Sequence, residues 1–186
     1  MTNLINLITI IRIILAPVIL FFLTTGNYLM CTLLFFVAVL TDYFDVHLAR
    51  KYNEESQLWE ILDPIADKIL IVFILLGLSV ALDSFLIAFL SSLIIAREIG
   101  VAALRDYSAR NNISDRTKVT FLAKTKTAVQ LFTIGSYLLA MTLNLNLLIV
   151  VSDILLMIAT LITIYTGYQY ALKVSQKWKF LLLVED

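Results

Sequence analysis

Residues 28–82 read YLMCTLLFFVAVLTDYFDVHLARKYNEESQLWEILDPIADKILIVFILLGLSVAL, and this stretch decides the fold. It contains two apolar runs, 28–46 and 61–82, separated by a polar segment. A helix that spans a bilayer needs about 20 mostly apolar residues, so each run is long enough to cross a membrane. The stretch therefore predicts a pair of antiparallel transmembrane helices whose polar ends lie at the same membrane face.

The rest of the chain follows the same pattern. The protein has 186 residues, of which 61% are hydrophobic and 15% are charged, and a soluble domain of this length cannot bury so much apolar surface. Four further runs are long enough to span a membrane: 7–24, 84–105, 121–143 and 146–171. The first of these lacks a small-residue cleavage site, so we expect a retained helix rather than a signal peptide. The sequence thus predicts an all-α, polytopic membrane protein with six transmembrane helices in a single domain, 1–186.

The basic residues gather at one end of the predicted helices. The turns near Gly26, Asp83 and Asn144 contain no Lys or Arg, and all 14 Lys and Arg residues fall toward the other helix ends. Basic residues concentrate on the cytoplasmic side of membrane proteins. With an even number of helices, the pattern predicts that both termini are cytoplasmic.

Charged side chains also lie inside the apolar runs, in a layer near the cytoplasmic boundary. At about 1.5 Å rise per residue, this layer lies roughly 20–30 Å from the outer turns. Its members are Asp42, Asp45, Asp63, Asp67, Arg97, Lys124 and Lys126. Asp42 and Asp45 are spaced i, i+3. Asp63 and Asp67 are spaced i, i+4, so each pair projects from one helix face, and the four carboxylates are expected to converge from two adjacent helices.

Converging carboxylates repel one another strongly at low dielectric, and bound cations relieve that repulsion. Mg²⁺ and Mn²⁺ prefer oxygen ligands, and paired ions of this kind suit phosphoryl displacement. Arginines and lysines at the same depth would bind an anion. The alternatives are an ion-pair network that only joins helices, or an N-cap role for Asp63 directly before Pro64. A cation transporter fits less well, because transporter sites lie near the bilayer midplane and this sequence has no repeat.

One acidic residue lies away from this layer. Asp153 stands in the last apolar run, nearer the predicted outer side, and the sequence shows no partner for it. An intramembrane carboxylate is unfavourable unless it is hydrated or paired. We therefore expect Asp153 to be either a hydrated interfacial residue or a contact between subunits.

The charged layer carries a family pattern. Asp42-Tyr-Phe-Asp45, Ala49-Arg50 and Asp63-Pro-Ile-Ala-Asp67 resemble the signature of the CDP-alcohol phosphatidyltransferase family, D-x2-D-G-x2-A-R-x8-G-x3-D-x3-D. A match of six fixed positions in a membrane setting is specific. Further residues resemble the bacterial phosphatidylglycerophosphate synthases of this family, whose acceptor is glycerol 3-phosphate. They are Asn6, Thr9, Arg12, Arg97-Glu98, Leu104-Arg105 and Lys124-Thr-Lys126-Thr127.

The resemblance implies an activity as well as a fold. Members of the family are six-helix membrane proteins, usually homodimers, with a cytoplasm-facing polar chamber that holds two divalent metals, Mg²⁺ or Mn²⁺. The implied reaction transfers a phosphatidyl group from CDP-diacylglycerol to glycerol 3-phosphate. The acceptor hydroxyl attacks the β-phosphorus and CMP leaves. We therefore expect an enzyme of the bacterial inner membrane, surrounded by membrane lipids, with no nucleic acid among its partners.

The resemblance also implies a role for each matching residue. Asp42, Asp45 and Asp63 would bind metal, and Asp67 would be both a metal ligand and the base that takes the hydroxyl proton. The CDP-lipid would be bound around Asp45, Ala49 and Arg50. The acceptor phosphate would be bound by a polar and cationic group: Thr9, Arg12, Arg97, Arg105, Lys124 and Lys126.

Two glycines of the signature are replaced, by Val46 and Trp59. Val46 lies one turn after Asp42 and Trp59 one turn before Asp63, so both side chains should point toward the CDP-lipid. Glycine at such positions lets a ligand approach the backbone, and larger side chains should crowd the nucleotide. The open alternatives are a reshaped pocket, a weakly active or inactive relative, a chain altered at these positions, or a sibling enzyme with another acceptor alcohol.

Replacement of both residues by glycine tests this placement. If Val46 and Trp59 line the nucleotide pocket, the double variant Val46→Gly, Trp59→Gly should bind CDP-lipid more tightly and release more CMP per folded molecule. Glycine costs about 1 kcal/mol at a helix-interior site relative to alanine, so thermal stability is measured alongside. A double variant that stays folded but gains neither affinity nor turnover would show that the two side chains do not obstruct the pocket.

Overall fold

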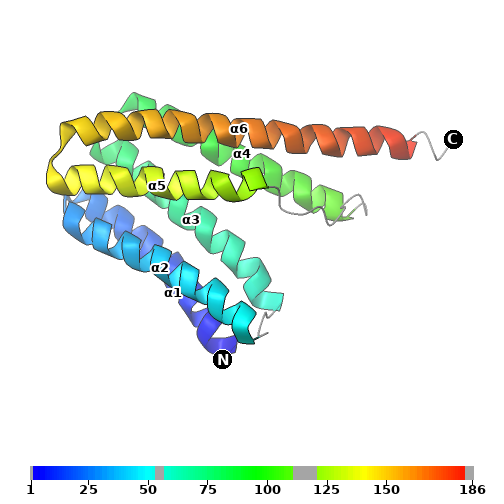
Figure 1. The fold of residues 1–186 in the computed structure, drawn as a ribbon, viewed down its shortest axis with the longest axis horizontal. Helices are drawn as coiled ribbons and strands as arrows, with labels where there is room; N and C mark the ends of the chain where they lie inside the picture. The colour runs from blue at the N-terminus through cyan, green and yellow to red at the C-terminus, as the bar shows by residue number, and fades with distance from the viewer. Residues whose placement is uncertain (1, 53–56, 111–120, 183–186) are drawn as a thin grey trace.

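The chain is all-helical in the part that the computed structural model describes, which comprises the backbone of residues 2–52, 57–110 and 121–182 and the side chains of 7–42, 62–110 and 125–176. Figure 1 shows the six helices: α1 (Thr2–Thr24), α2 (Tyr28–Tyr52), α3 (Gln57–Ala81), α4 (Phe85–Arg110), α5 (Phe121–Leu143) and α6 (Asn146–Leu182). These ranges contain no strand. The all-α prediction is therefore confirmed.

Three short turns join the helices in antiparallel pairs, and all three lie at the same end of the molecule (Figure 1, left). Each turn has one residue with a left-handed backbone: Gly26 (φ 79°), Asp83 (φ 44°) and Asn144 (φ 53°). Glycine, asparagine and aspartate are the residues that adopt this conformation most readily, and it ends a helix by turning the chain away from the axis. The turns predicted at these three residues are thus present.

Several helices extend beyond the apolar runs that predicted them. α2 continues to Tyr52, α3 begins as early as Gln57, and α6 continues to Leu182. Apolar composition marks where lipid surrounds a helix, whereas backbone hydrogen bonding continues into polar sequence. One interpretation is corrected as a result. Asp63 and Pro64 lie inside α3, so the N-cap role considered for Asp63 is wrong.

Among the described residues, four helices contain a segment long and apolar enough to cross a membrane: Leu7–Thr24, Leu62–Ala81, Phe85–Arg110 and Asn146–Gln176. α2 contributes a shorter apolar segment, Tyr28–Asp42. Large apolar side chains such as Phe85, Phe132 and Leu147 are mostly exposed, which lipid tolerates better than water does. The protein is therefore a multi-pass membrane protein, and the number of six crossings stays a prediction.

α1 lies between the two helices that carry the signature. α1 packs against both α2 and α3, whereas α2 and α3 make no close backbone contact with each other in the ranges that are described. The contact of α1 with α3 is tight, because a Cβ at Gly77 would lie 2.7 Å from Cδ1 of Leu23. Carboxylates from α2 and α3 converge as the sequence predicts for the three that are described, and α1 packs against both helices beside them.

α3 also links the two halves of the molecule. It packs against α4 and α5 as well as against α1, and α6 packs against α4 and α5. In Figure 1, α1, α2 and α3 diverge from α4 and α6 with increasing distance from the short turns. The charged layer predicted from the sequence lies toward this wider end.

Polar contacts join α5 to α6 near their shared turn. The hydroxyl of Tyr137 donates a hydrogen bond to Oδ1 of Asp153 at 2.5 Å. At the preceding position on each helix, the hydroxyls of Ser136 and Ser152 are 2.7 Å apart. Asp153 thus has a partner within its own chain, which the sequence did not reveal because the contact depends on how two helices pack.

The Tyr137 to Asp153 hydrogen bond should contribute measurably to stability. Tyr137→Phe removes the donor and leaves the carboxylate without it, which should lower the free energy of unfolding by about 1–3 kcal/mol. Thermal unfolding in detergent measures the loss. Tyr168→Phe, at an exposed tyrosine of α6, is the matched control and should change little. Equal melting temperatures for the wild type and Tyr137→Phe would contradict the expectation.

Candidate active site

Three carboxylates meet beside α1. Asp42 comes from α2, and Asp63 and Asp67 come from successive turns of α3. One carboxylate oxygen of each lies within 4.8 Å of the others, and all three side chains are half-buried. We call these three residues the acidic cluster. The i, i+4 spacing on α3 brings two of them to one face, and the packing of α1 against both helices brings the third.

Arg12 of α1 supplies positive charge to the acidic cluster. Its guanidinium is fully buried, and Nη1 lies 2.7 Å from Oδ1 of Asp42, 3.2 Å from Oδ1 of Asp63 and 3.0 Å from Oδ1 of Asp67. A buried arginine needs this kind of pairing, because removal of a charge from water is unfavourable unless opposite charges surround it. The sequence grouped Arg12 with the residues that bind acceptor phosphate. The structure brings it to the carboxylates.

The acidic cluster also fits a divalent cation. Three carboxylate oxygens from two helices form an all-oxygen donor set, which hard cations such as Mg²⁺ and Mn²⁺ prefer. A single guanidinium nitrogen of Arg12 contacts all three carboxylates, so a positive charge is favourable at the position between them. The cluster is at once the ion-pair network considered from the sequence and a set of residues that could hold a metal ion.

A cleft of about 220 Å³ lies next to the acidic cluster, between α3, α4 and α5. Its charged lining residues are Asp67, Lys68, Arg97, Glu98, Arg105 and Lys126. Four of these carry positive charge and two carry negative charge when all are ionised, so the cleft has a formal excess of two positive charges. A cleft of this kind is suited to an anion with two negative charges, such as a phosphate monoester.

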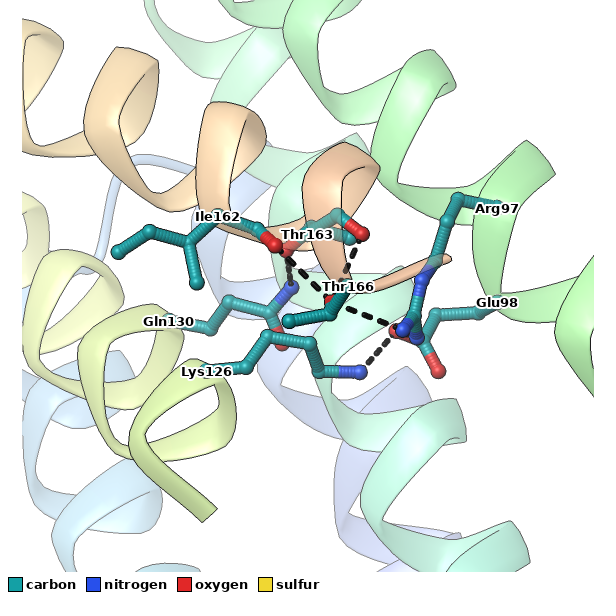
Figure 2. Close-up of polar contacts among 7 residues, drawn as sticks. All are labelled: Arg97, Glu98, Lys126, Gln130, Ile162, Thr163 and Thr166. Carbon is teal, nitrogen blue, oxygen red and sulfur yellow. Dashed lines mark hydrogen bonds and ion pairs between the residues drawn. The ribbon is translucent and has the colours of Figure 1, made fainter. Parts of the chain in front are cut away.

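Glu98 holds two of the cations in place (Figure 2). Nη1 of Arg97 donates to Oε1 of Glu98 at 2.9 Å, and Nζ of Lys126 donates to the same oxygen. Nη2 of Arg97 donates to the hydroxyl of Thr166 on α6 at 2.9 Å. The head groups from α4 and α5 are therefore fixed close together at the cleft, although like charges at this separation would otherwise repel.

The structure adds residues that sequence reasoning missed. Lys68 lines the cleft directly after Asp67, and Glu98 pairs with two cations, yet neither was assigned a role. Glu98 was visible as the neighbour of Arg97, and Lys68 as the residue directly after Asp67. Thr166 left no signal of this kind, since a threonine in an apolar helix usually bonds only to its own backbone.

The remaining predicted residues fall into two groups. Arg105 lines the cleft, and Cζ lies 5.7 Å from the ring centroid of Tyr170. Thr9 is fully buried one turn from Arg12 and does not line the cleft. The other side chains lie outside the described residues, and they are those of Asp45, Val46, Ala49, Arg50, Trp59 and Lys124.

Asp67 belongs to both parts of the site. It contacts Arg12 in the acidic cluster, and it lines the cationic cleft. Carboxylates that attract cations therefore adjoin a cleft that attracts anions, and one carboxylate is shared by the two. This arrangement can hold a phosphorylated small molecule so that its hydroxyl lies close to a carboxylate. A hydroxyl that attacks the phosphorus of another molecule needs a group in that position to take its proton.

Comparisons with known proteins point to a single protein family. The sequence model of the CDP-alcohol phosphatidyltransferase family matches residues 2–183. The chain is similar to a protein of Rickettsia bellii (strain RML369-C) named CDP-diacylglycerol--glycerol-3-phosphate 3-phosphatidyltransferase, with 41% identity over 90% of this chain and 93% of the relative. Proteins of the same name from Haemophilus influenzae and Escherichia coli (strain K12) are each 34% identical. The alignments cover 88% of this chain and 88% of the Haemophilus relative, and 69% and 72% for the Escherichia relative.

The acidic cluster pairs with Arg12 and could also hold a metal ion, so the effect of removing the arginine should depend on the metal. Arg12→Gln removes the buried guanidinium and leaves three converging carboxylates, so stability in the presence of a chelator should fall by about 3–5 kcal/mol. Millimolar Mn²⁺ should recover part of this loss, because a divalent cation would neutralise the same oxygens. Thermal unfolding with EDTA and with Mn²⁺ measures both effects.

Arg110→Gln is the matched control for this experiment. Arg110 is exposed and pairs with exposed Asp106 at 3.0 Å, so its loss should change stability little under either condition. If Arg12→Gln loses the same stability with and without Mn²⁺, the acidic cluster does not bind the ion.

Proposed function

The chain belongs to the CDP-alcohol phosphatidyltransferase family, and from that premise we propose that it transfers a phosphatidyl group from CDP-diacylglycerol to glycerol 3-phosphate, giving phosphatidylglycerophosphate and CMP. The relatives named above carry this activity in their names and match most of this chain. The observation that carries the proposal is the position of Asp67, which is shared by the acidic cluster and the cationic cleft.

The cleft accounts for the choice of acceptor. Glycerol 3-phosphate is a phosphate monoester with close to two negative charges at neutral pH, and the cleft has a formal excess of two positive charges. Arg97, Arg105 and Lys126 surround the space that the phosphate would occupy. An uncharged acceptor such as glycerol, or a zwitterion such as serine, would leave these cations without an anionic partner.

Asp67 is the group best placed to take the proton of the acceptor hydroxyl. The acceptor oxygen forms a bond to the β-phosphorus of CDP-diacylglycerol, and the bond from that phosphorus to the CMP oxygen breaks. The hydroxyl proton passes to a carboxylate oxygen of Asp67, and CMP leaves as the anion. Because Asp67 lines the cleft, an acceptor held there by its phosphate presents its hydroxyl near the carboxylate.

The acidic cluster is proposed as the metal site. Asp42, Asp63 and Asp67, together with Asp45, would hold two ions of Mg²⁺ or Mn²⁺, which neutralise the charge on the diphosphate and stabilise the leaving phosphate. The described donor set supports this assignment. Arg12 would keep the carboxylates partly neutralised, and its removal would therefore affect metal affinity as well as stability.

The CDP-lipid would lie along the cytoplasmic ends of α2 and α3. Asp45, Ala49 and Arg50 are proposed to bind the cytidine diphosphate, with Val46 and Trp59 at its edge. The family signature at these positions supports the assignment. The acyl chains would remain in the bilayer while glycerol 3-phosphate enters from the cytoplasm.

The orientation follows from the distribution of charge. We place the protein in the bacterial inner membrane with both termini in the cytoplasm, because all Lys and Arg residues lie away from the three short turns. The homodimer that the family resemblance implies stays a prediction.

Acceptor-dependent release of CMP by the purified protein tests the proposed function. With CDP-diacylglycerol and Mg²⁺ or Mn²⁺, CMP should appear with glycerol 3-phosphate and be far slower with glycerol or serine, which lack the phosphate group. EDTA should abolish it. Asp67→Asn should lower the rate by about 100-fold or more, because a positioned general base contributes about that much.

The matched control is Asp106→Asn, at an exposed aspartate near the end of α4, and it should retain wild-type turnover. Faster CMP release with another acceptor would assign the chain to a sibling activity. Wild-type turnover by Asp67→Asn would remove this residue from the reaction.

A further inference from the structure

One face of α6 contacts the cations of the cleft although α6 contributes no residue to its lining among those described. Thr163, Thr166, Gly167 and Tyr170 follow i, i+3, i+4 and i+7 spacing, so they share that face. None of them belongs to the family signature or to the charged layer. We call this set the α6 face.

Thr166 fixes the orientation of the Arg97 guanidinium. Its hydroxyl can donate to the backbone oxygen of Ile162 at 2.9 Å or of Thr163 at 3.0 Å, which leaves its oxygen to accept from Nη2 of Arg97 at 2.9 Å. Nη1 of the same guanidinium is held by Glu98. Figure 2 shows the head group of Arg97 close to both Thr166 and Glu98. A guanidinium held through two nitrogens has a defined plane, which is what bidentate binding of phosphate requires.

Gly167 provides the space that Arg97 occupies. A Cβ at this position would lie 2.8 Å from Nε and 2.9 Å from Cγ of Arg97. Cγ lies in the inner part of the side chain and Nε is part of the guanidinium itself, so neither atom can move aside without shifting the guanidinium. The backbone of α6 at Gly167 is therefore one wall of the Arg97 site.

The rest of the α6 face holds neighbouring groups of the cleft. The ring of Tyr170 lies under the guanidinium of Arg105 at 5.7 Å, a cation–π distance. Nε2 of Gln130, a residue that lines the cleft from α5, donates to the hydroxyl of Thr163 at 3.0 Å. One helix face thus contacts three residues of the cleft that come from two other helices.

We propose that the α6 face positions Arg97 and Arg105 for a phosphate monoester and so determines the specificity for the acceptor. Thr166, Gly167 and Tyr170 act through the two arginines and do not touch the substrate. The identity of the substrate in this inference rests on the proposed function. The contacts of α6 with the two arginines do not depend on which substrate binds.

Steady-state kinetics of substitutions on α6 test the proposal. Thr166→Val removes the acceptor of the Arg97 hydrogen bond at nearly constant volume, and Gly167→Ala introduces the Cβ contact. Each should raise KM for glycerol 3-phosphate by about tenfold, which is the worth of one hydrogen bond to a charged group, with KM for CDP-diacylglycerol changed less than about twofold. Thr166→Ser keeps the hydroxyl and should recover the wild-type KM.

Two matched controls separate positioning from packing. Thr160→Val is at a buried threonine two turns away on α6 whose hydroxyl donates to the Leu156 backbone. Gly100→Ala is at a glycine of α4 with no atom within 4 Å of the added Cβ. Neither should change KM for glycerol 3-phosphate. Equal increases in both KM values for Gly167→Ala, or a Thr166→Ser variant as impaired as Thr166→Val, would overturn the proposal.

Ligand-induced thermal stabilisation distinguishes failure of this proposal from failure of the proposed function. Inorganic phosphate and glycerol 3-phosphate should each raise the melting temperature of the wild type, and the increase should be smaller in Gly167→Ala. If the wild type transfers to a different acceptor but keeps this contrast, the proposed function fails and the positioning role stands. If phosphate stabilises the wild type and Gly167→Ala equally, the positioning role fails.

Discussion

The salt bridges of Arg12 with Asp42, Asp63 and Asp67 connect α1 to both α2 and α3, whose backbones make no close contact with each other in the described ranges. A charge within a membrane domain is tolerated only where opposite charges or water surround it. The carboxylates of α2 and α3 therefore depend on the guanidinium of α1, and the guanidinium depends on them. This mutual requirement fixes the depth and rotation of three helices relative to one another, and the position of Asp67 against the cleft follows from it.

The same requirement organises the cationic side. Arg97 and Lys126 both line the cleft and would repel each other there, and the single carboxylate of Glu98 holds both. Neither group is balanced by its own residues: the acidic cluster has more carboxylates than cations, and the cleft has more cations than carboxylates. The two imbalances have opposite sign and adjoin at Asp67. A divalent cation on one side and a phosphate on the other would relieve both.

Local periodicity explains which of these features the sequence predicts. Apolar runs identify the helices, and Gly26, Asp83 and Asn144 identify the turns, because both signals arise from neighbouring residues. The i, i+4 spacing likewise predicts that Asp63 and Asp67 share a face. Hydrophobicity does not reveal that α3 begins at Gln57, since Gln57 and Glu60 put its first turn outside the apolar run, and this led to the incorrect N-cap interpretation of Asp63. The position of Arg12 depends on α1 packing between α2 and α3, and no local pattern encodes that order of helices.

The site divides between the two halves of the chain. The acidic cluster and its arginine come from α1, α2 and α3, whereas the cations of the cleft, apart from Lys68, come from α4 and α5. Asp67 is the charged residue that the described part of the chain shares between them. A substitution among the cations of α4 and α5, or among the α6 residues that hold Arg97, alters the shape and charge of the cleft without moving Asp42 or Arg12. Under the proposed function, the chemistry of bond cleavage and the choice of acceptor would therefore be physically separable in this fold. Among the charged residues that the structure describes, Asp67 alone would serve both, because the same carboxylate pairs with Arg12 and lines the cleft beside Arg97.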